Sequence, residues 1–283
     1  MSLASSAMLS TLSVTLWTAR KTDKIVSAQI DEANKTLARA GNYHKRLLPE
    51  DDNLLKIKHI ADEARAYHNQ YTSPWSDGGQ RLLTTAYFLP YKKAMTAYQN
   101  RFYAAVDEFI PQYTVKVSGA AFSLGFLFNR DEYPSEEQVR SKLSFSVFFT
   151  PVPQAGDFRV DVQNEALDEL KRQYDEMYTH NVKRINQDLW NRMYTTLSQL
   201  SNGLKIDEDG KKGRLYESVF ETAEELCDIL QHLNISNDTQ LEEMRQQLEA
   251  QIVGVDLRDV KQSDFMRLQM KKQVDAMLDK WND

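Results

Sequence analysis

The acidic turn DEDG at residues 207–210 has a composition that could bind calcium. A calcium-binding helix–loop–helix loop carries oxygen ligands at positions 1, 3 and 5, a glycine at position 6 and a carboxylate at position 12. With Gly210 at position 6, Lys205 falls at position 1 and Tyr216 at position 12, so both essential ligands are missing. We therefore predict a solvated turn, and we assign no metal ligands to the chain.

The histidines offer no pair with the spacing His-x-x-x-His that zinc sites on helices use; they are His44, His59, His68, His180 and His232. Glu176 and His180 lie four residues apart on a predicted helix, so their side chains can touch. We interpret them as a surface pair rather than half of a metal site, because no second such pair occurs.

Nucleophilic and phosphate-binding motifs are also missing from the sequence. The only cysteine, Cys227, lies beside the apolar stripe of a predicted helix, and we predict that it is a small buried core residue. The sequence contains no Gly-x-Gly-x-x-Gly, no Gly-x-x-x-x-Gly-Lys-Ser/Thr and no Gly-x-Ser-x-Gly. We therefore predict no catalytic residue, no cofactor and no small-molecule substrate, and we expect that the protein is not an enzyme.

Several basic residues stand beside aromatic residues, a combination that could bind single-stranded nucleic acid by stacking and charge. They are Arg101-Phe102-Tyr103, Phe158-Arg159, and Arg184 with Trp190 and Arg192; the densest basic stretch is Lys211-Lys212-Gly213-Arg214. Most of the aromatic residues recur at the spacing of a packed core, however. We favour core packing for them and keep nucleic-acid binding as the alternative.

The composition bounds the class of protein. Glycine (10) and proline (7) are scarce among 283 residues, which favours long helices. With one cysteine no internal disulfide forms, so we expect a reducing compartment, the cytoplasm. Residues 1–19 carry no charge but include eight Ser or Thr, so we expect neither an export signal nor a membrane span.

The net charge of −6 is concentrated near the end of the sequence. Residues 214–283 hold eight basic and fifteen acidic residues. An acidic surface repels phosphate backbones, which argues against nucleic-acid binding by this segment. We interpret it as the solvated face of a set of helices.

The first part of the chain mixes helices with short strands. Alternation predicts a strand at 11–18, and apolar residues spaced by three and four predict helices at 23–40 and 49–71. Residues 81–89 read as extended before Pro90 opens a helix with an aromatic face from Met95 to Phe109. Residues 113–128 fit either a strand or a buried helix, and the sequence does not decide between them. A capping box begins a short helix at Ser135, and strands 144–150 and 158–162 form a predicted hairpin.

The last part reads as helix throughout. Residues 163–204 predict one helix about 60 Å long, with an apolar stripe from Ile185 to Leu200. A turn at 207–213 and a returning helix at 214–233 complete an antiparallel, coiled-coil-like hairpin, followed by helices at 238–252 and 263–281. The predicted fold is therefore mainly α with a small antiparallel β element (α+β). We place the domain boundary at 162, which gives parts 1–162 and 163–283.

Four segments carry a resemblance to a known group of proteins: LSVTLWTARK, RLLTTAYFLP, YPSEEQVRSKLSFSVFF and VGVDLRD. They are similar to a family of uncharacterised proteins of phages and integrative elements. The genes of that family often lie beside genes for a MoxR-type AAA+ ATPase and a von Willebrand A-domain protein. The resemblance implies a cytoplasmic phage or mobile-element protein in a bacterial host, and it assigns no functional residues.

Two functional hypotheses follow. The first is a non-catalytic interaction or scaffold protein that assembles with itself or with an AAA+ ATPase module through the long hairpin. The second is a single-stranded nucleic-acid-binding or recombination accessory protein. We expect a protein partner or self-association, nucleic acid as the second class of partner, and no membrane.

Overall fold

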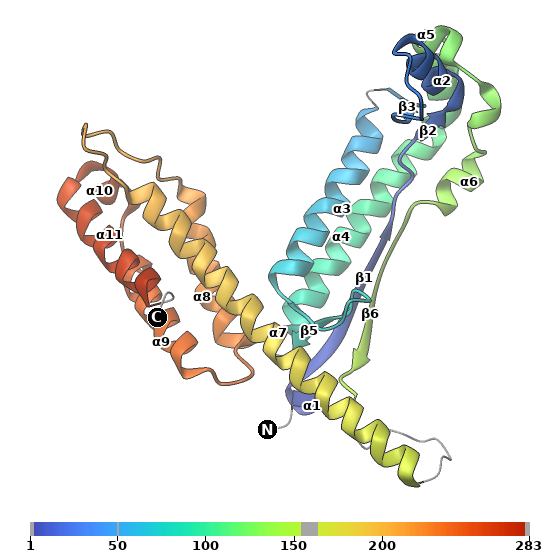
Figure 1. The fold of residues 1–283 in the computed structure, drawn as a ribbon. Helices are drawn as coiled ribbons and strands as arrows, with labels where there is room; N and C mark the ends of the chain where they lie inside the picture. Colours follow the sequence, from blue (N-terminus) through green and yellow to red (C-terminus); the bar gives the residue numbers. More distant parts are fainter. Residues whose placement is uncertain (1–2, 50, 154–163, 281–283) are drawn as a thin grey trace. The chain divides into compact units, whose positions relative to one another are not determined.

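The computed structural model describes residues 3–49, 51–153 and 164–280 (Figure 1). It is mainly helical with a small antiparallel sheet, as the sequence predicts. The chain divides into two compact units: unit 1 comprises residues 1–11, 69–91 and 149–283, and unit 2 comprises 12–68 and 92–148. This division differs from a single boundary at 162, because residues 69–91 form strands and turns that belong with the C-terminal helices.

Most helices of unit 1 lie in the C-terminal part of the sequence; its elements are α1 (Leu3–Ser6), β4 (Ser73–Pro74), β5 (Arg81–Thr84), α7 (Asn164–Leu204), α8 (Glu217–Leu233), α9 (Thr239–Ile252), α10 (Leu257–Gln262) and α11 (Asp264–Asp279). The 3₁₀ turn η1 (Thr85–Tyr87) follows β5. Unit 2 contains β2 (Arg20–Asp23), α2 (Lys24–Ala33), β3 (Tyr43–Arg46), α5 (Tyr113–Leu124) and α6 (Glu136–Ser141), with 3₁₀ turns η2 (Ile110–Gln112), η3 (Gly125–Leu127) and η4 (Arg130–Glu132). Residues of both units make up β1 (Ala7–Thr15), α3 (Asp52–Gln70), α4 (Phe88–Phe109) and β6 (Ser144–Pro151).

The described strands form two sheets. The larger has the order β4-β5-β1-β6, with β1 antiparallel to β5 and β5 antiparallel to β4. The smaller pairs β2 with β3. The predicted strand at 11–18 begins earlier, at Ala7, and ends at Thr15, because residues 7–10 pair with residues 81–84 of β5. The predicted strand at 158–162 lies outside the described residues.

Two helix predictions need correction, and one open alternative is decided. The helix expected at 23–40 ends at Ala33, and Lys35 then adopts a left-handed conformation (φ 50°) that stops it. Its predicted stripe is not a core face, since Ile25 is 73% and Leu37 is 107% exposed. Residues 113–124, which the sequence left open, are helical, and α4 starts at Phe88 rather than at the proline that follows.

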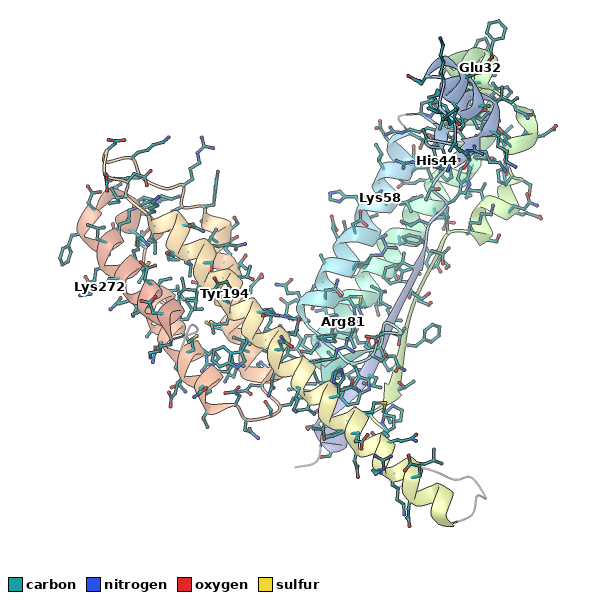
Figure 2. All side chains as sticks on the ribbon, in the orientation of Figure 1. Glu32, His44, Lys58, Arg81, Tyr194 and Lys272 are labelled. Atoms are coloured by element: carbon teal, nitrogen blue, oxygen red, sulfur yellow. The ribbon has the colours of Figure 1, made fainter. Side chains whose placement is uncertain are left out.

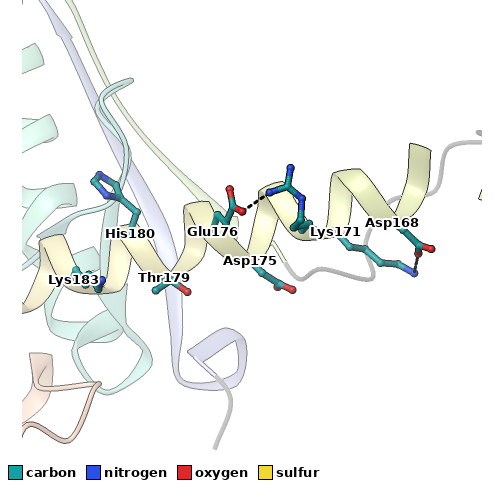
Figure 3. A pocket seen from close by; sticks show the side chains of 8 residues that line it. Asp168, Lys171, Asp175, Glu176, Thr179, His180 and Lys183 are labelled. Carbon is teal, nitrogen blue, oxygen red and sulfur yellow. Dashed lines mark hydrogen bonds and ion pairs between the residues drawn. The ribbon is translucent and has the colours of Figure 1, made fainter. Parts of the chain in front are cut away.

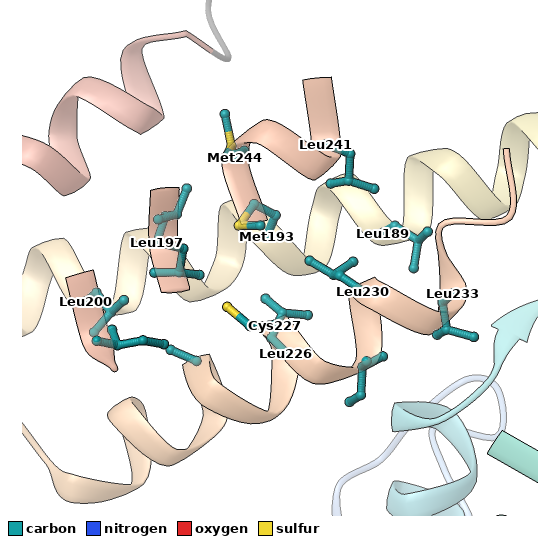
Figure 4. Packing of buried hydrophobic residues seen from close by; sticks show 14 of the residues in the cluster. Leu189, Met193, Leu197, Leu200, Leu226, Cys227, Leu230, Leu233, Leu241 and Met244 are labelled. Atoms are coloured by element: carbon teal, nitrogen blue, oxygen red, sulfur yellow. The ribbon is translucent and has the colours of Figure 1, made fainter. Parts of the chain in front are cut away.

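Unit 1 buries one core shared by α7, α8, α9 and α11 (Figure 4). The predicted stripe on α7 is buried from Ile185 through Leu189, Met193 and Leu197 to Leu200. Side chains of α8 and α9 pack against it, among them Leu226, Leu230, Leu241 and Met244. Burial of these apolar surfaces, at roughly 25 cal/mol per Å², holds the helices together.

Unit 2 packs the predicted aromatic face of α4. Met95, Phe102, Val106 and Phe109 are all at most 2% exposed. The Trp17 ring packs against Phe109 and Tyr113, and α3 contributes small and branched residues, Ile57, Ile60, Ala61 and Ala64. The capping box at Ser135 is present, with Gln138 as its second member. Within the described residues, no helix combines the length and the apolar character needed to cross a membrane.

Candidate interaction surface

The acidic turn at 207–210 is a tight hairpin. The Asp207 N–H donates to the Lys211 carbonyl at 2.9 Å, and Gly210 takes the positive φ (76°) that the turn requires. The Lys205 ammonium lies 2.8 Å from the Asp207 carboxylate and already neutralises it. In the part of the chain that the structure describes, no three His, Cys, Asp or Glu side chains converge on a point that could hold a metal ion.

Glu176 and His180 line a shallow hollow of about 650 Å³ along α7 (Figure 3). All eight lining residues come from this one helix, and most are charged: Asp168, Lys171, Arg172, Asp175, Glu176, Thr179, His180 and Lys183. The Glu176 carboxylate accepts a hydrogen bond from Arg172 at 2.5 Å, drawn as a dashed line at Glu176 in Figure 3. The hollow is therefore a charged surface of one helix, in which the Glu176 carboxylate is engaged by Arg172.

Cys227 lies in the core of unit 1, as predicted. Its side chain is 3% exposed, and the thiol lies 3.8 Å from the Arg245 carbonyl oxygen. Burial raises the pKa of the thiol to about 12, so the thiolate is almost absent at neutral pH. The residue therefore acts as a small apolar side chain.

We expect Cys227 to resist a thiol-reactive aromatic disulfide in the folded protein at neutral pH, because the reagent needs an accessible thiolate. The reaction, followed by absorbance, should go to completion only when denaturant is added. Rapid complete labelling without denaturant would contradict the buried position of the thiol.

Most of the described basic and aromatic residues singled out in the sequence are engaged in internal contacts, whereas Lys211 and Arg214 are exposed. Phe102 is fully buried, Tyr103 hydrogen-bonds the Phe145 backbone, and Arg101 pairs with Glu63 at 2.9 Å. The Trp190 indole N–H donates to Asp238, Arg184 pairs with Asp77, and Lys212 pairs with Asp264. Each of these side chains therefore has a partner within the fold. Residues 158–159 lie outside the described part.

Arg192 and Arg81 share the C-terminal end of α3. Arg192 donates to the carbonyl oxygens of Asn69, Gln70 and Thr72 at 2.6–2.9 Å, and Arg81 donates to those of Asn69 and Thr72. The last carbonyls of a helix have no partner within the helix and form the negative end of its dipole. Two guanidinium groups therefore cap this end, and Figure 2 labels Arg81.

No protein-family model, curated protein or solved structure matches the chain. Its function must therefore be argued from its own surfaces.

The helix α5 of unit 2 carries large exposed apolar side chains. This helix buries Tyr113, Val117 and Ala120, which share one side of it. At 100° per residue, Val115, Gly119 and Phe122 point to the opposite side, and Val115 is 74% and Phe122 is 91% exposed. An α-helix that is apolar on both sides is normally buried on both sides.

Phe126 extends this surface beyond the end of α5 and is 110% exposed. We call Val115, Gly119, Phe122 and Phe126 the α5 stripe. The only charged residue of α5, Lys116, is turned to other partners: its ammonium lies 2.5 Å from Asp51 and 3.0 Å from the Asn53 side-chain oxygen. The stripe is therefore uncharged. The sequence signal for the α5 stripe is the unusually apolar run at 113–128, whose spacing does not distinguish a strand from a helix.

Proposed function

We propose that this protein is a non-catalytic helical interaction protein that associates through the α5 stripe. The observation that carries the proposal is the exposure of Phe122 and Phe126, at 91% and 110%. Contiguous exposed apolar side chains on a folded domain mark protein–protein contact sites, because water contact with them is unfavourable. The protein carries out no reaction of its own and works in the bacterial cytoplasm.

A second copy of the chain is the occupant that the stripe fits best. The stripe contains no charged side chain, so two copies meet without like-charge repulsion. Gly119 leaves a gap in the middle of the stripe, since a side-chain carbon added there would meet no atom within 4 Å. In a two-fold pair the same patch contacts itself, so Phe122 of each copy fills the gap at Gly119 of the other.

The remaining helices provide the rigid part of this scaffold. α7 and α8 contact each other, and both bury their apolar faces in the core of unit 1. We propose that the pair is an antiparallel, coiled-coil-like hairpin that serves as a stiff support. The resemblance of the sequence to proteins encoded beside MoxR-type ATPases makes an AAA+ module the alternative partner of the scaffold.

Size-exclusion chromatography with light scattering tests the proposal on the full chain. We expect a dimer that Phe122→Asp converts to a monomer, because a buried carboxylate in the pair is strongly unfavourable. Gly119→Leu should have the same effect by closing the gap, and in the monomer the added Cβ meets no atom within 4 Å.

Phe265→Asp is the matched control. This phenylalanine is 76% exposed on α11, in unit 1, and its replacement should leave the dimer intact. A wild-type protein that is monomeric at every concentration would reject self-association through the stripe. In that case, capture of wild type but not Phe122→Asp by a purified AAA+ module would assign the stripe to the alternative partner.

Binding of nucleic acid is the second candidate function. It is favoured by a different surface, the β2–β3 pair of unit 2, whose arginines have no ion-pair partner among the described residues.

A further inference from the structure

The two-stranded β2–β3 sheet places its side chains on two distinct faces. Residues directly opposite each other on paired strands point to the same side, and neighbours along a strand alternate. The register pairs Arg20 with Arg46 and Thr22 with His44. These four residues therefore share one face, which we call the cationic ribbon face, and Figure 2 labels His44 on it.

The other face of the sheet anchors it to unit 2. Lys45 is 4% exposed; its ammonium lies 2.7 Å from Glu132 and 3.2 Å from Asp23, and it donates to the Leu127 carbonyl at 2.8 Å. These contacts tie β3 to Asp23, the N-cap residue of α2, and to the turns η3 and η4. The cationic ribbon face is thus presented by a fixed support.

The cations of the cationic ribbon face are not neutralised by the described part of the fold. Arg20, His44 and Arg46 are exposed, and the Thr22 hydroxyl lies 3.1 Å from the His44 ring. Within the described residues, neither Arg20 nor Arg46 forms an ion pair or a side-chain hydrogen bond. Like charges placed directly opposite on paired strands destabilise a sheet. Folding alone therefore does not account for two opposed arginines.

The charge of the surrounding segment has the same sign. Residues 20–46 contain seven basic and three acidic residues, although the whole chain has a net charge of −6. Two of the three acids are engaged within the segment: Asp23 with Lys45 and Asp31 with the Ala40 N–H. The positive potential of the segment consequently reaches the solvent.

We infer that the cationic ribbon face binds the phosphate backbone of a nucleic acid. The planar guanidinium group matches a phosphate with two parallel hydrogen bonds, and two such groups side by side fit successive phosphates. The face has no apolar side chain, whereas a protein interface needs an apolar centre. Nucleic-acid interfaces are, by contrast, polar and positively charged.

Fluorescence anisotropy with short labelled oligonucleotides, single-stranded and duplex, tests the inference on the full chain. We expect binding at low salt that weakens about tenfold or more in Arg20→Ala with Arg46→Ala, since each lost charged contact exceeds a tenfold effect. If two phosphates are contacted, the slope of log affinity against log salt falls by about 1.4 for a single strand and about 1.8 for a duplex. Comparing the single-stranded with the duplex oligonucleotide shows which form of nucleic acid the protein binds.

Lys211→Ala with Arg214→Ala is the matched control. These residues are also exposed basic residues, in unit 1, and their replacement changes the net charge equally. We expect the control to bind like wild type. If the control lost as much affinity as the Arg20→Ala, Arg46→Ala variant, the loss would depend only on overall charge. That result would overturn the inference.

A second variant separates binding from folding. Arg20→Glu places opposite charges across the strands at the Arg20–Arg46 pair, so we expect the melting temperature to hold or rise while binding is lost. Three results would overturn the inference: no oligonucleotide binding at low salt, unchanged binding in the double arginine variant, or equal competition by polyglutamate. These results leave the dimer test of the α5 stripe unaffected, so the two proposals fail separately.

Discussion

Replacing Arg267 with methionine is expected to destabilise unit 1 by about 3 kcal/mol, because it removes the partner of two buried carbonyl groups and of a third that is partly buried. The side chain is 2% exposed. Its guanidinium donates to the carbonyl oxygens of Leu204 at 3.2 Å, Gly203 and Gly213. It thereby joins the C-terminal end of α7 to the chain that returns toward α8.

The local geometry explains why a long cation is needed there. The backbone at Gly213 runs so close to α7 that a side-chain carbon added to it would lie 2.5 Å from the Asn202 carbonyl oxygen. Carbonyl groups from both segments are therefore crowded at one point, and the last carbonyls of α7 have no partner within the helix. Burial lowers the pKa of Arg267, and Asp264 opposes this shift, so the cation persists and its desolvation offsets part of its hydrogen bonding.

Hydrogen exchange measured by mass spectrometry would check the effect within unit 1. We expect faster exchange in peptides from 196–216 and 264–279 of Arg267→Met, together with a lower urea midpoint. Arg267→Lys should fall between wild type and Arg267→Met, because one ammonium cannot reach three carbonyls. Arg258→Met, the same change at an exposed position on α10, should stay within about 0.5 kcal/mol of wild type. Equal protection in the Arg267→Met and Arg258→Met variants would refute the role of the buried guanidinium.

Replacing Lys45 with methionine is expected to destabilise unit 2 by a comparable amount, about 3 kcal/mol. The change leaves the carboxylates of Asp23 and Glu132, 12% and 18% exposed, without their shared cation. Breaking a buried ion pair by removing one partner is strongly unfavourable, since the remaining charge stays desolvated. Hydrogen exchange in peptides covering 20–46 and 125–133 should report the loss.

The register of the β2–β3 sheet supplies the control. Lys21 lies directly opposite Lys45 but is exposed, so Lys21→Met makes the same chemical change without removing a buried ion pair. We expect Lys21→Met to preserve the protection of these peptides. If Lys45→Met and Lys21→Met lose protection equally, the stability of the β2–β3 region depends on surface charge, and the buried contacts of Lys45 are unimportant.

The same contacts predict a pH dependence. The Val26 N–H holds the pKa of Asp23 below 3.8, against the opposing effect of burial and with help from Lys45. The stability that Asp23 contributes is present above pH 3.8 and is lost as the pH falls through the lowered pKa.

The alkaline limit is set by Lys45. Burial by itself would lower the pKa of Lys45, but Glu132 and Asp23 reverse this and raise it above 10.5. The Lys45 contribution is therefore present below pH 10.5 and is lost as the pH rises through the raised value. Protection of residues 20–46 from hydrogen exchange should be greatest between these two pH limits. In Asp23→Asn the loss of protection at acidic pH should be smaller.

Short-range patterns in the sequence were enough to place many elements of the fold. Apolar spacing located the buried faces of α4 and α7, and the Ser135 capping box located the start of α6. The helix predicted at 23–40 is present but ends at Ala33, and its predicted apolar stripe is not a core face, because Ile25 and Leu37 are exposed. Periodicity identifies which residues share a face, and it carries no information on whether another element covers that face.

The sequence by itself determined that the chain is mainly helical, that the stripe on α7 is a core face and that Cys227 is buried. Only the tertiary structure decided which cations are engaged by the fold and which face solvent. Arg267 meets carbonyls 54 to 64 residues away, and Lys45 meets one 82 residues away, whereas Arg20 and Arg46 lie opposite each other with no ion-pair partner in the described chain. The physical reason is that hydrogen bonding and charge neutralisation depend on distances of a few ångströms in space, and these are set by packing between segments far apart in the chain.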